Sequence, residues 1–143
     1  MEITTLLKED HREVENLIAQ LEGGADKDTF TKLKSSLELH TQIEEEIYYP
    51  ALEGLDETDE LVTDAYQEHD EVDELLEEMS GTDVGSEEFQ DLLQQLKDSI
   101  NHHVKEEENE LFPKSEEVLG AEKLEHMGDE MEKMKTKSSK ATS

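Results

Sequence analysis

Apolar residues recur every three or four positions in four successive stretches of the chain. This spacing places them on one face of an α-helix, as in the core-facing side of a helix bundle. The stretches run from about Thr4 to Leu21, from about Asp28 to Ala51, from after Thr58 to Met79, and from Ser86 to about Pro113. Because the connections between them are short, neighbouring helices should be antiparallel. The sequence therefore predicts an all-α protein, an up-down-up-down antiparallel four-helix bundle.

The C-terminal region shows the same spacing over a shorter stretch. Four apolar residues carry it: Leu124, Met127, Met131 and Met134. They predict a short fifth helix, followed by a polar, disordered tail over 135–143. A chain of 143 residues is long enough for one domain with one core. We expect that domain to span 1–134.

The chain is strongly acidic, with 41 acidic and 13 basic residues and a formal net charge of −28. Such a surface repels nucleic acid and anionic lipid, so neither is an expected partner. Adaptation to a salty cytoplasm and a simply solvated acidic surface both account for the charge. The absence of cysteine excludes disulfides and thiolate metal ligands. No stretch resembles a signal peptide or a membrane span, which favours a cytoplasmic location.

Six polar residues lie on the predicted apolar faces: His11, His40, Glu44, His69, His103 and Glu107. Burying an unpaired polar group costs a few kcal/mol, and burying a charge costs more. A bound metal ion compensates such groups directly. Mixed imidazole and carboxylate ligands suit iron, zinc or manganese, so the six residues are the candidate metal ligands.

The spacing of these residues indicates two metal positions. His40 and Glu44 are four residues apart, as are His103 and Glu107, so each pair lies on one helix face about one turn apart. The segment from His40 to Pro50 also aligns without gaps on the segment from His103 to Pro113. This repeat predicts a site with pseudo-twofold symmetry in which the two glutamates bridge two ions.

Other polar residues near the predicted site are less certain ligands. Asp73, four residues after His69, is either an additional ligand or outer acceptor, or a solvated acid. Tyr66 either borders the site or is an ordinary core tyrosine. Four residues lie off the apolar faces and are expected at the surface: Glu45, Glu46, His102 and His126.

The combined pattern resembles the hemerythrin family, in its bacterial hemerythrin-like (HHE cation-binding) branch. The resemblance covers about residues 4–113 and includes the aromatic-proline pairs Tyr49-Pro50 and Phe112-Pro113. It implies a non-haem di-iron centre, held by the six candidate residues, with an oxo or hydroxo bridge between two iron ions. It further implies a small-molecule ligand, namely dioxygen, peroxide or nitric oxide.

The sequence departs from the oxygen carriers of that family at two positions. The carriers have a second histidine four residues after the third-helix histidine, where this chain has Asp73. The fourth-helix carboxylate is Glu107, rather than an aspartate one residue later. Three functions therefore stay open: binding of a small oxidant, peroxide-decomposing (catalase-like) activity, and sensing of iron or oxygen. A ferritin-like site is disfavoured, because it needs a glutamate three residues before a histidine.

Overall fold

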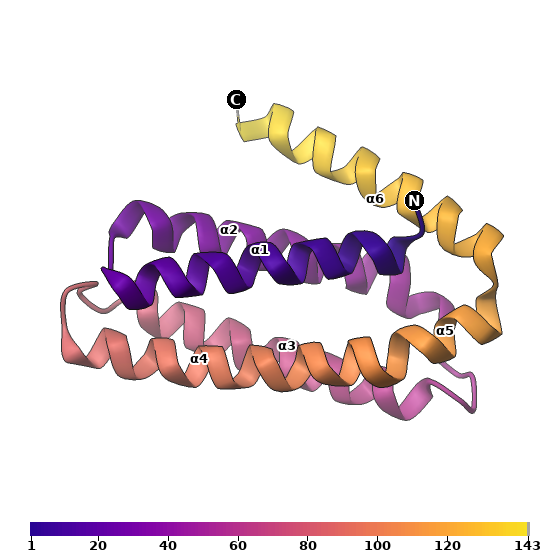
Figure 1. Ribbon diagram of the computed structural model, residues 1–143, viewed down its shortest axis with the longest axis horizontal. Coiled ribbons are helices and arrows are strands. Elements are labelled where there is room, and N and C mark those ends of the chain that lie inside the picture. Colours follow the sequence, from indigo (N-terminus) through magenta and orange to yellow (C-terminus); the bar gives the residue numbers. More distant parts are fainter. Residues whose placement is uncertain (143) are drawn as a thin grey trace.

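The structure, a computed structural model, describes residues 1–142, with side-chain burial given for residues 1–138. Every regular element within that range is helical: α1 (Ile3–Gly23), α2 (Lys27–Ile43), η1 (Glu44–Tyr48), η2 (Tyr49–Ala51), α3 (Asp59–Ser80), α4 (Glu87–Glu106), η3 (Glu107–Leu111), α5 (Phe112–Leu119) and α6 (Ala121–Thr142). Figure 1 shows α1 antiparallel to α2, and α3 antiparallel to α4. The predicted all-α antiparallel bundle is confirmed.

The starts of α2 and α4 follow from their capping residues. The Asp26 carboxylate accepts hydrogen bonds from the backbone N–H groups of Asp28 and Thr29, so the N-cap is Asp26 and α2 begins at Lys27, one residue before the predicted start near Asp28. The Ser86 hydroxyl accepts a hydrogen bond from the Phe89 N–H, as expected for an N-cap serine. Capping satisfies N–H groups that have no partner inside the helix.

Two short π-helices, η1 and η3, directly follow α2 and α4. A π-helix is wound more widely than an α-helix and shifts the side chains that follow it. Tyr48 and Tyr49 are therefore fully buried, whereas Ile47, which the three-to-four spacing of the second stretch places on the buried face, is only half-buried. The predicted end of the fourth helix near Pro113 was also wrong. Pro113 lies in the first turn of α5, which continues directly from η3, so the chain stays helical past Pro113 to Leu119.

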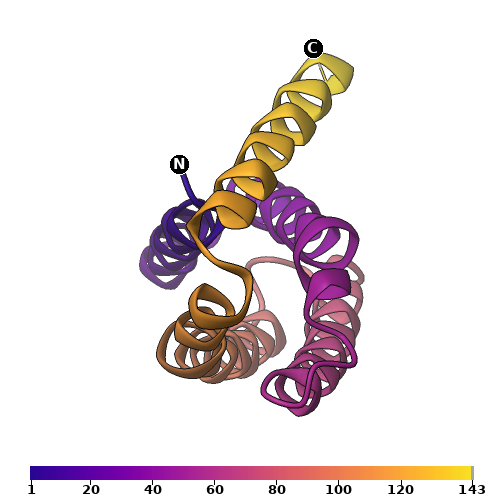
Figure 2. The same cartoon turned by 90° about the vertical axis from the view of Figure 1, so that its right-hand side faces the viewer.

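The apolar core is divided into two clusters along the bundle axis. One cluster lies toward the α1–α2 and α3–α4 turns and includes Phe30 and Phe89, whose rings pack edge to face. The other lies toward η1, α5 and α6 and includes Tyr48 and Phe112. Viewed end-on in Figure 2, the helices α1, α2, α3 and α4 surround this interior and α6 lies outside them. The buried histidines and glutamates lie between the two clusters.

The C-terminal helix α6 packs against α1, η1 and α2. Leu124 and Met131 are fully buried in this contact. Gly128 permits the close approach, because a Cβ there would overlap the carbonyl of Met1. The helix is longer than predicted and includes part of the predicted 135–143 tail. Ser143 lies outside the described residues, and the domain boundary after residue 134 stays a prediction.

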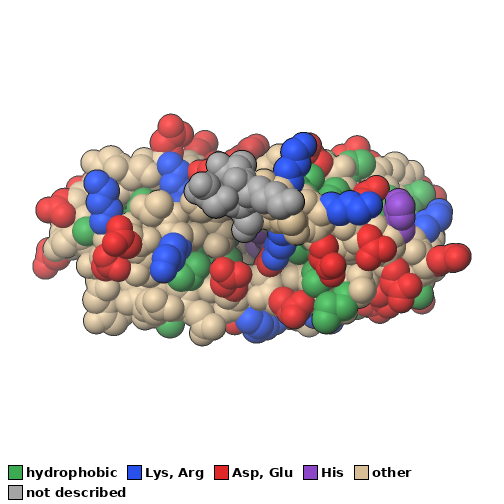
Figure 3. All heavy atoms as spheres, turned by 90° about the horizontal axis from the view of Figure 1, so that it is seen from above, with side chains coloured by type: hydrophobic (Ala, Val, Ile, Leu, Met, Phe, Trp, Pro, Cys, Tyr) green, Lys and Arg blue, Asp and Glu red, His purple; other side chains and the backbone are tan. Residues whose placement is uncertain are grey.

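The surface is polar, with acidic side chains, lysines and scattered apolar side chains interspersed on the face shown in Figure 3. Among the described residues, no helix combines the length and the apolar character needed to span a bilayer.

Candidate metal centre

The first group of predicted site residues joins three helices of the bundle. His11 of α1, His40 of α2, Glu44 and Glu107 place one ligand-type atom each within 4.8 Å of all the others. His11 Nε2 lies 3.1 Å from Glu107 Oε1, and His40 Nε2 lies 3.2 Å from Glu44 Oε1. All four residues are buried.

The second group joins α3 and α4 to the same carboxylates. His69 Nε2 lies 3.0 Å from Glu44 Oε1. His103 Nε2 lies 3.7 Å from the same oxygen and 3.3 Å from Glu107 Oε1. Glu44 belongs to both groups and Glu107 approaches both. The two carboxylates therefore lie between two pairs of histidines, which is the arrangement the repeat predicted.

Of the six candidate ligands, α1 supplies only His11 and α3 only His69. The Nδ1 atom of each donates to a carboxylate outside the centre. His11 Nδ1 lies 2.7 Å from Glu108 Oε2, and His69 Nδ1 lies 2.7 Å from Glu45 Oε2. A carboxylate can only accept, so these bonds place a proton on Nδ1 and turn Nε2 toward the central glutamates, where a metal would replace any proton on Nε2. Glu45 is exposed over 40% of its side chain, as expected, and also accepts this hydrogen bond, which was not predicted.

His40 and His103, which are paired with the central glutamates on their own helices, also direct Nδ1 at an outer carboxylate. His40 Nδ1 lies 3.0 Å from Asp10 Oδ2, and His103 Nδ1 lies 2.6 Å from Glu68 Oε1. Carboxylates in this position orient a ligating histidine and raise its basicity. All four histidines thus turn Nε2 toward the interior and Nδ1 toward an outer acid.

The sequence contains a signal for these outer carboxylates that periodicity alone does not reveal. An acid directly precedes each single histidine, in Asp10-His11 and Glu68-His69. An acid also directly follows each central glutamate, in Glu44-Glu45 and Glu107-Glu108. The outer acids obey the same pseudo-twofold relation as the inner six residues.

An aromatic residue covers the centre from each half of the bundle. Tyr49 is fully buried, its hydroxyl donates to Glu107 Oε2 at 2.6 Å, and its ring stacks on His69. Phe112 is equally buried and stacks on His11. Both residues lie five positions after a central glutamate, which is about one turn of a π-helix. The π-turns therefore bring these rings onto the site.

Charge in the buried centre is concentrated on the histidine–carboxylate pairs. Burial lowers the pKa of His40, but Glu44 and Asp10 outweigh burial and raise that pKa to about 10. Burial would raise the pKa of Glu44, yet His40 and neighbouring hydrogen bonds hold it well below its usual value. Burial, together with the charges of Glu107 and Glu44, raises the pKa of Tyr49 well above its usual value. A metal ion would have to displace protons from the histidines on binding.

Three buried atoms show that the residues fit a metal. His40 Nε2, His103 Nε2 and Glu44 Oε2 have no hydrogen-bond partner within the described part of the chain. Leaving such groups unpaired costs roughly 1–3 kcal/mol each. All three face the interior of the centre, and such nitrogen and oxygen atoms, once deprotonated, suit iron, manganese or zinc. The cluster is compatible with a metal-binding site.

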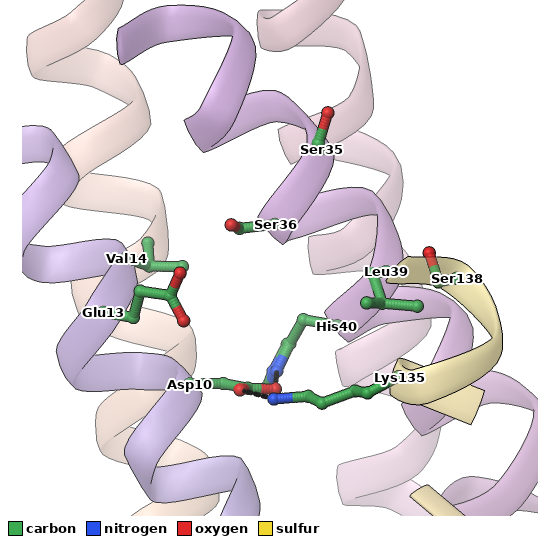
Figure 4. Close-up of a pocket in the computed structure, with 9 residues that line it drawn as sticks. All are labelled: Asp10, Glu13, Val14, Ser35, Ser36, Leu39, His40, Lys135 and Ser138. Atoms are coloured by element: carbon green, nitrogen blue, oxygen red, sulfur yellow. Dashed lines mark hydrogen bonds and ion pairs between the residues drawn. The ribbon is translucent and has the colours of Figure 1, made fainter. Parts of the chain in front are cut away.

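A surface pocket reaches the centre beside His40. It lies between α1, α2 and α6, and its lining includes Asp10, His40 and Lys135. Figure 4 shows Lys135 extending from α6 to Asp10, with which it forms an ion pair. The acid that orients His40 is thus held from a second side by the C-terminal helix.

The remaining candidate residues lie outside the centre. Asp73 is exposed and belongs to neither group of potential ligands in the described residues. Tyr66 packs edge to face on Tyr49, and its hydroxyl donates to Glu53. His102 and His126 are exposed, as predicted.

Comparison with known proteins agrees with this site. Residues 2–115 match the Hemerythrin HHE cation binding domain family. A protein of Nostoc sp. named DNA nickase is 31% identical over 144 residues, covering 96% of this chain and 40% of that protein. The chain thus spans about two fifths of the length of that relative. An uncharacterized hemerythrin-like protein of Schizosaccharomyces pombe is 27% identical, covering 93% of this chain and 68% of that protein.

A solved structure extends the agreement to the fold. The crystal structure of a hemerythrin HHE cation-binding domain-containing protein from Mycobacterium kansasii superposes with a TM-score of 0.78 at 25% sequence identity. The match covers 96% of this chain and 89% of that one. With the family match extending over most of its length, the chain belongs to the hemerythrin HHE cation-binding domain family.

Proposed function

We propose that the chain is a non-haem di-iron protein that binds dioxygen or a related small oxidant, such as peroxide or nitric oxide. The observation that carries the proposal is the set of four inward-facing histidine Nε2 atoms around two fully buried glutamates. The proposed ligands are His11, His40, Glu44, His69, His103 and Glu107. His11 and His40 would serve one ion, His69 and His103 the other, and both glutamates would serve both.

Bound iron supplies a redox-active Lewis acid at which a small molecule can bind. The chain orients the ligating imidazoles, excludes water from the centre and supplies the hydroxyl of Tyr49. The outer carboxylates fix each imidazole, and the two apolar clusters exclude water from both ends of the centre. The Tyr49 hydroxyl lies 3.3 Å from His69 Nε2 and donates its proton to Glu107 Oε2, so it orients that carboxylate at the centre.

One test is the metal content and absorption spectrum of the purified protein. Protein loaded with iron should carry two ions per chain and change its spectrum reversibly with dioxygen or nitric oxide. His40→Ala and Glu107→Ala should lose iron, whereas His126→Ala, which removes an exposed histidine, should keep both ions. If both site variants retain two ions, the ligand assignment is wrong. Purification with zinc alone and no affinity for iron would refute the di-iron proposal.

Peroxide decomposition is the second candidate function. The observation that favours it is the exposed position of Asp73, which leaves His69 as the histidine that α3 supplies to the centre. Fewer protein ligands leave more positions at which a small molecule can bind. Sustained oxygen evolution from peroxide would support this activity, and a stable adduct without turnover would support binding alone.

A further inference from the structure

We propose that Glu68, His102 and Glu106 form a second, surface metal site that takes up a divalent cation and passes it to the buried centre. The three residues place ligand-type atoms within 4.8 Å of one another. The binding step stands on the geometry of this cluster. The delivery step rests on the metal centre proposed above.

The cluster combines two helices and two ligand types. His102 Nε2 lies 3.1 Å from Glu106 Oε1 on α4 and 3.2 Å from Glu68 Oε2 on α3. His102 is well exposed, with 64% of its side chain accessible, whereas the two glutamates are mostly covered. One imidazole with two carboxylates is a donor set suited to Mn²⁺, Fe²⁺ or Zn²⁺. The site is therefore open to solvent on one side and held by the bundle on the other.

Glu68 connects this cluster to the buried centre. Its Oε1 accepts the hydrogen bond from His103 Nδ1 at 2.6 Å, while its Oε2 faces His102. Glu68 and Glu106 line a crevice together with His103, Glu107 and three apolar residues, and the crevice is too narrow to hold a water molecule, so passage of an ion requires these side chains to move apart. His103 is 8% exposed, and its Nε2 has no hydrogen-bond partner in the described residues. Glu68 alone thus separates an ion at the surface cluster from His103, whose buried Nε2 lacks a hydrogen-bond partner in the described residues.

The outer carboxylates differ in their positively charged partners. Asp10 pairs with Lys135 and Glu108 with Arg12. In the described part of the chain, no lysine or arginine pairs with Glu68, which faces His102 and His103 instead. A cation at Glu68 therefore competes with these two histidines and not with a permanent positive charge, and a charged cleft raises the local concentration of the opposite ion.

The first experiment counts ions at the surface site while the centre is full. Iron-loaded protein is titrated with Mn²⁺, and free Mn²⁺ is followed by electron paramagnetic resonance. The wild type should bind one Mn²⁺ that His102→Ala and Glu106→Gln both lose. His126→Ala is the matched control, because His126 and Glu130 form an exposed pair at the same i,i+4 spacing but have no third ligand among the residues that the structure describes. No bound Mn²⁺, or equal loss in the control, would overturn the proposal.

The second experiment measures delivery. Metal-stripped protein is mixed with Fe²⁺ without oxygen, and uptake is followed in time. Glu106→Gln, which removes a negative charge from the cluster, should slow uptake by about tenfold, the low end of electrostatic focusing, and should still reach the wild-type iron content. Unchanged uptake would refute delivery. If stripped wild-type protein takes up no iron at all, the proposed centre fails, whereas the Mn²⁺ count still decides whether the surface site binds.

Discussion

Removal of the Tyr49 hydroxyl tests whether a single hydrogen bond supports the buried carboxylates. In Tyr49→Phe the ring stays and still stacks on His69, but Glu107 Oε2 loses a donor at 2.6 Å. A hydrogen bond to a charged group contributes roughly 1.5–3 kcal/mol, and the acceptor left behind is fully buried. We therefore expect metal-free protein to lose about 2 kcal/mol of unfolding free energy, which corresponds to roughly 6 °C in Tm for a domain of this size.

Tyr66→Phe is the matched control. Tyr66 also donates to a glutamate, Glu53, at 2.7 Å, but that bond is exposed to solvent. Water can replace it, so the loss should stay near 0.5 kcal/mol. Urea denaturation of both variants against the wild type gives the comparison. Equal losses in the two variants would refute the reasoning, because burial would then not distinguish them. In the metal-loaded protein, Tyr49→Phe should weaken metal binding by roughly tenfold or more, measured by competition with a chelator.

Three further predictions concern charge. The net charge of −28 should make Tm rise with KCl, since salt screens self-repulsion, and a flat response would contradict this. The pKa of His40 is raised from 6.5 to about 10 in the folded chain, so protonated His40 stabilises the metal-free fold fully below about pH 6.5. That contribution is lost as the pH rises through 10, and urea denaturation between pH 7 and 10 should show falling stability; stability that rises over this range would be the contrary result. Despite the name of its Nostoc relative, the chain should not shift duplex DNA in a gel at low salt; a salt-sensitive shift would overturn that expectation.

The positions of the six central residues could be predicted from the sequence because burial of polar groups is costly and helical spacing is regular. His40 and Glu44 share a helix face whether or not their neighbours are known. The outer carboxylates escaped the same reasoning because each lies beside a central residue and points about 100° away from it. Glu45 reaches His69 only because a neighbouring helix brings that ring to it. Such contacts are set by packing between helices and not by spacing within one.

The apolar spacing could not predict the π-turns or the length of α6, for a related reason. A strict three-to-four spacing assumes an α-helix throughout, so it assigned Ile47 to the buried face in place of Tyr48 and Tyr49. The helix α6 extends past Met134 into a polar segment, where Lys135 pairs with Asp10 of α1. A cytoplasmic location, the loaded metal and the small-molecule ligand stay predictions.

The two aromatic residues that follow the π-turns make the two sides of the centre chemically different. Tyr49 and Phe112 occupy equivalent positions in the two halves, and each stacks on a histidine of the other half. They differ by one oxygen atom. The side of Tyr49 therefore supplies a hydroxyl, donated to Glu107, whereas the side of Phe112 supplies hydrocarbon alone. The two sides of an otherwise near-symmetric centre are thus chemically different, and Phe112→Tyr would be the single change that makes them alike.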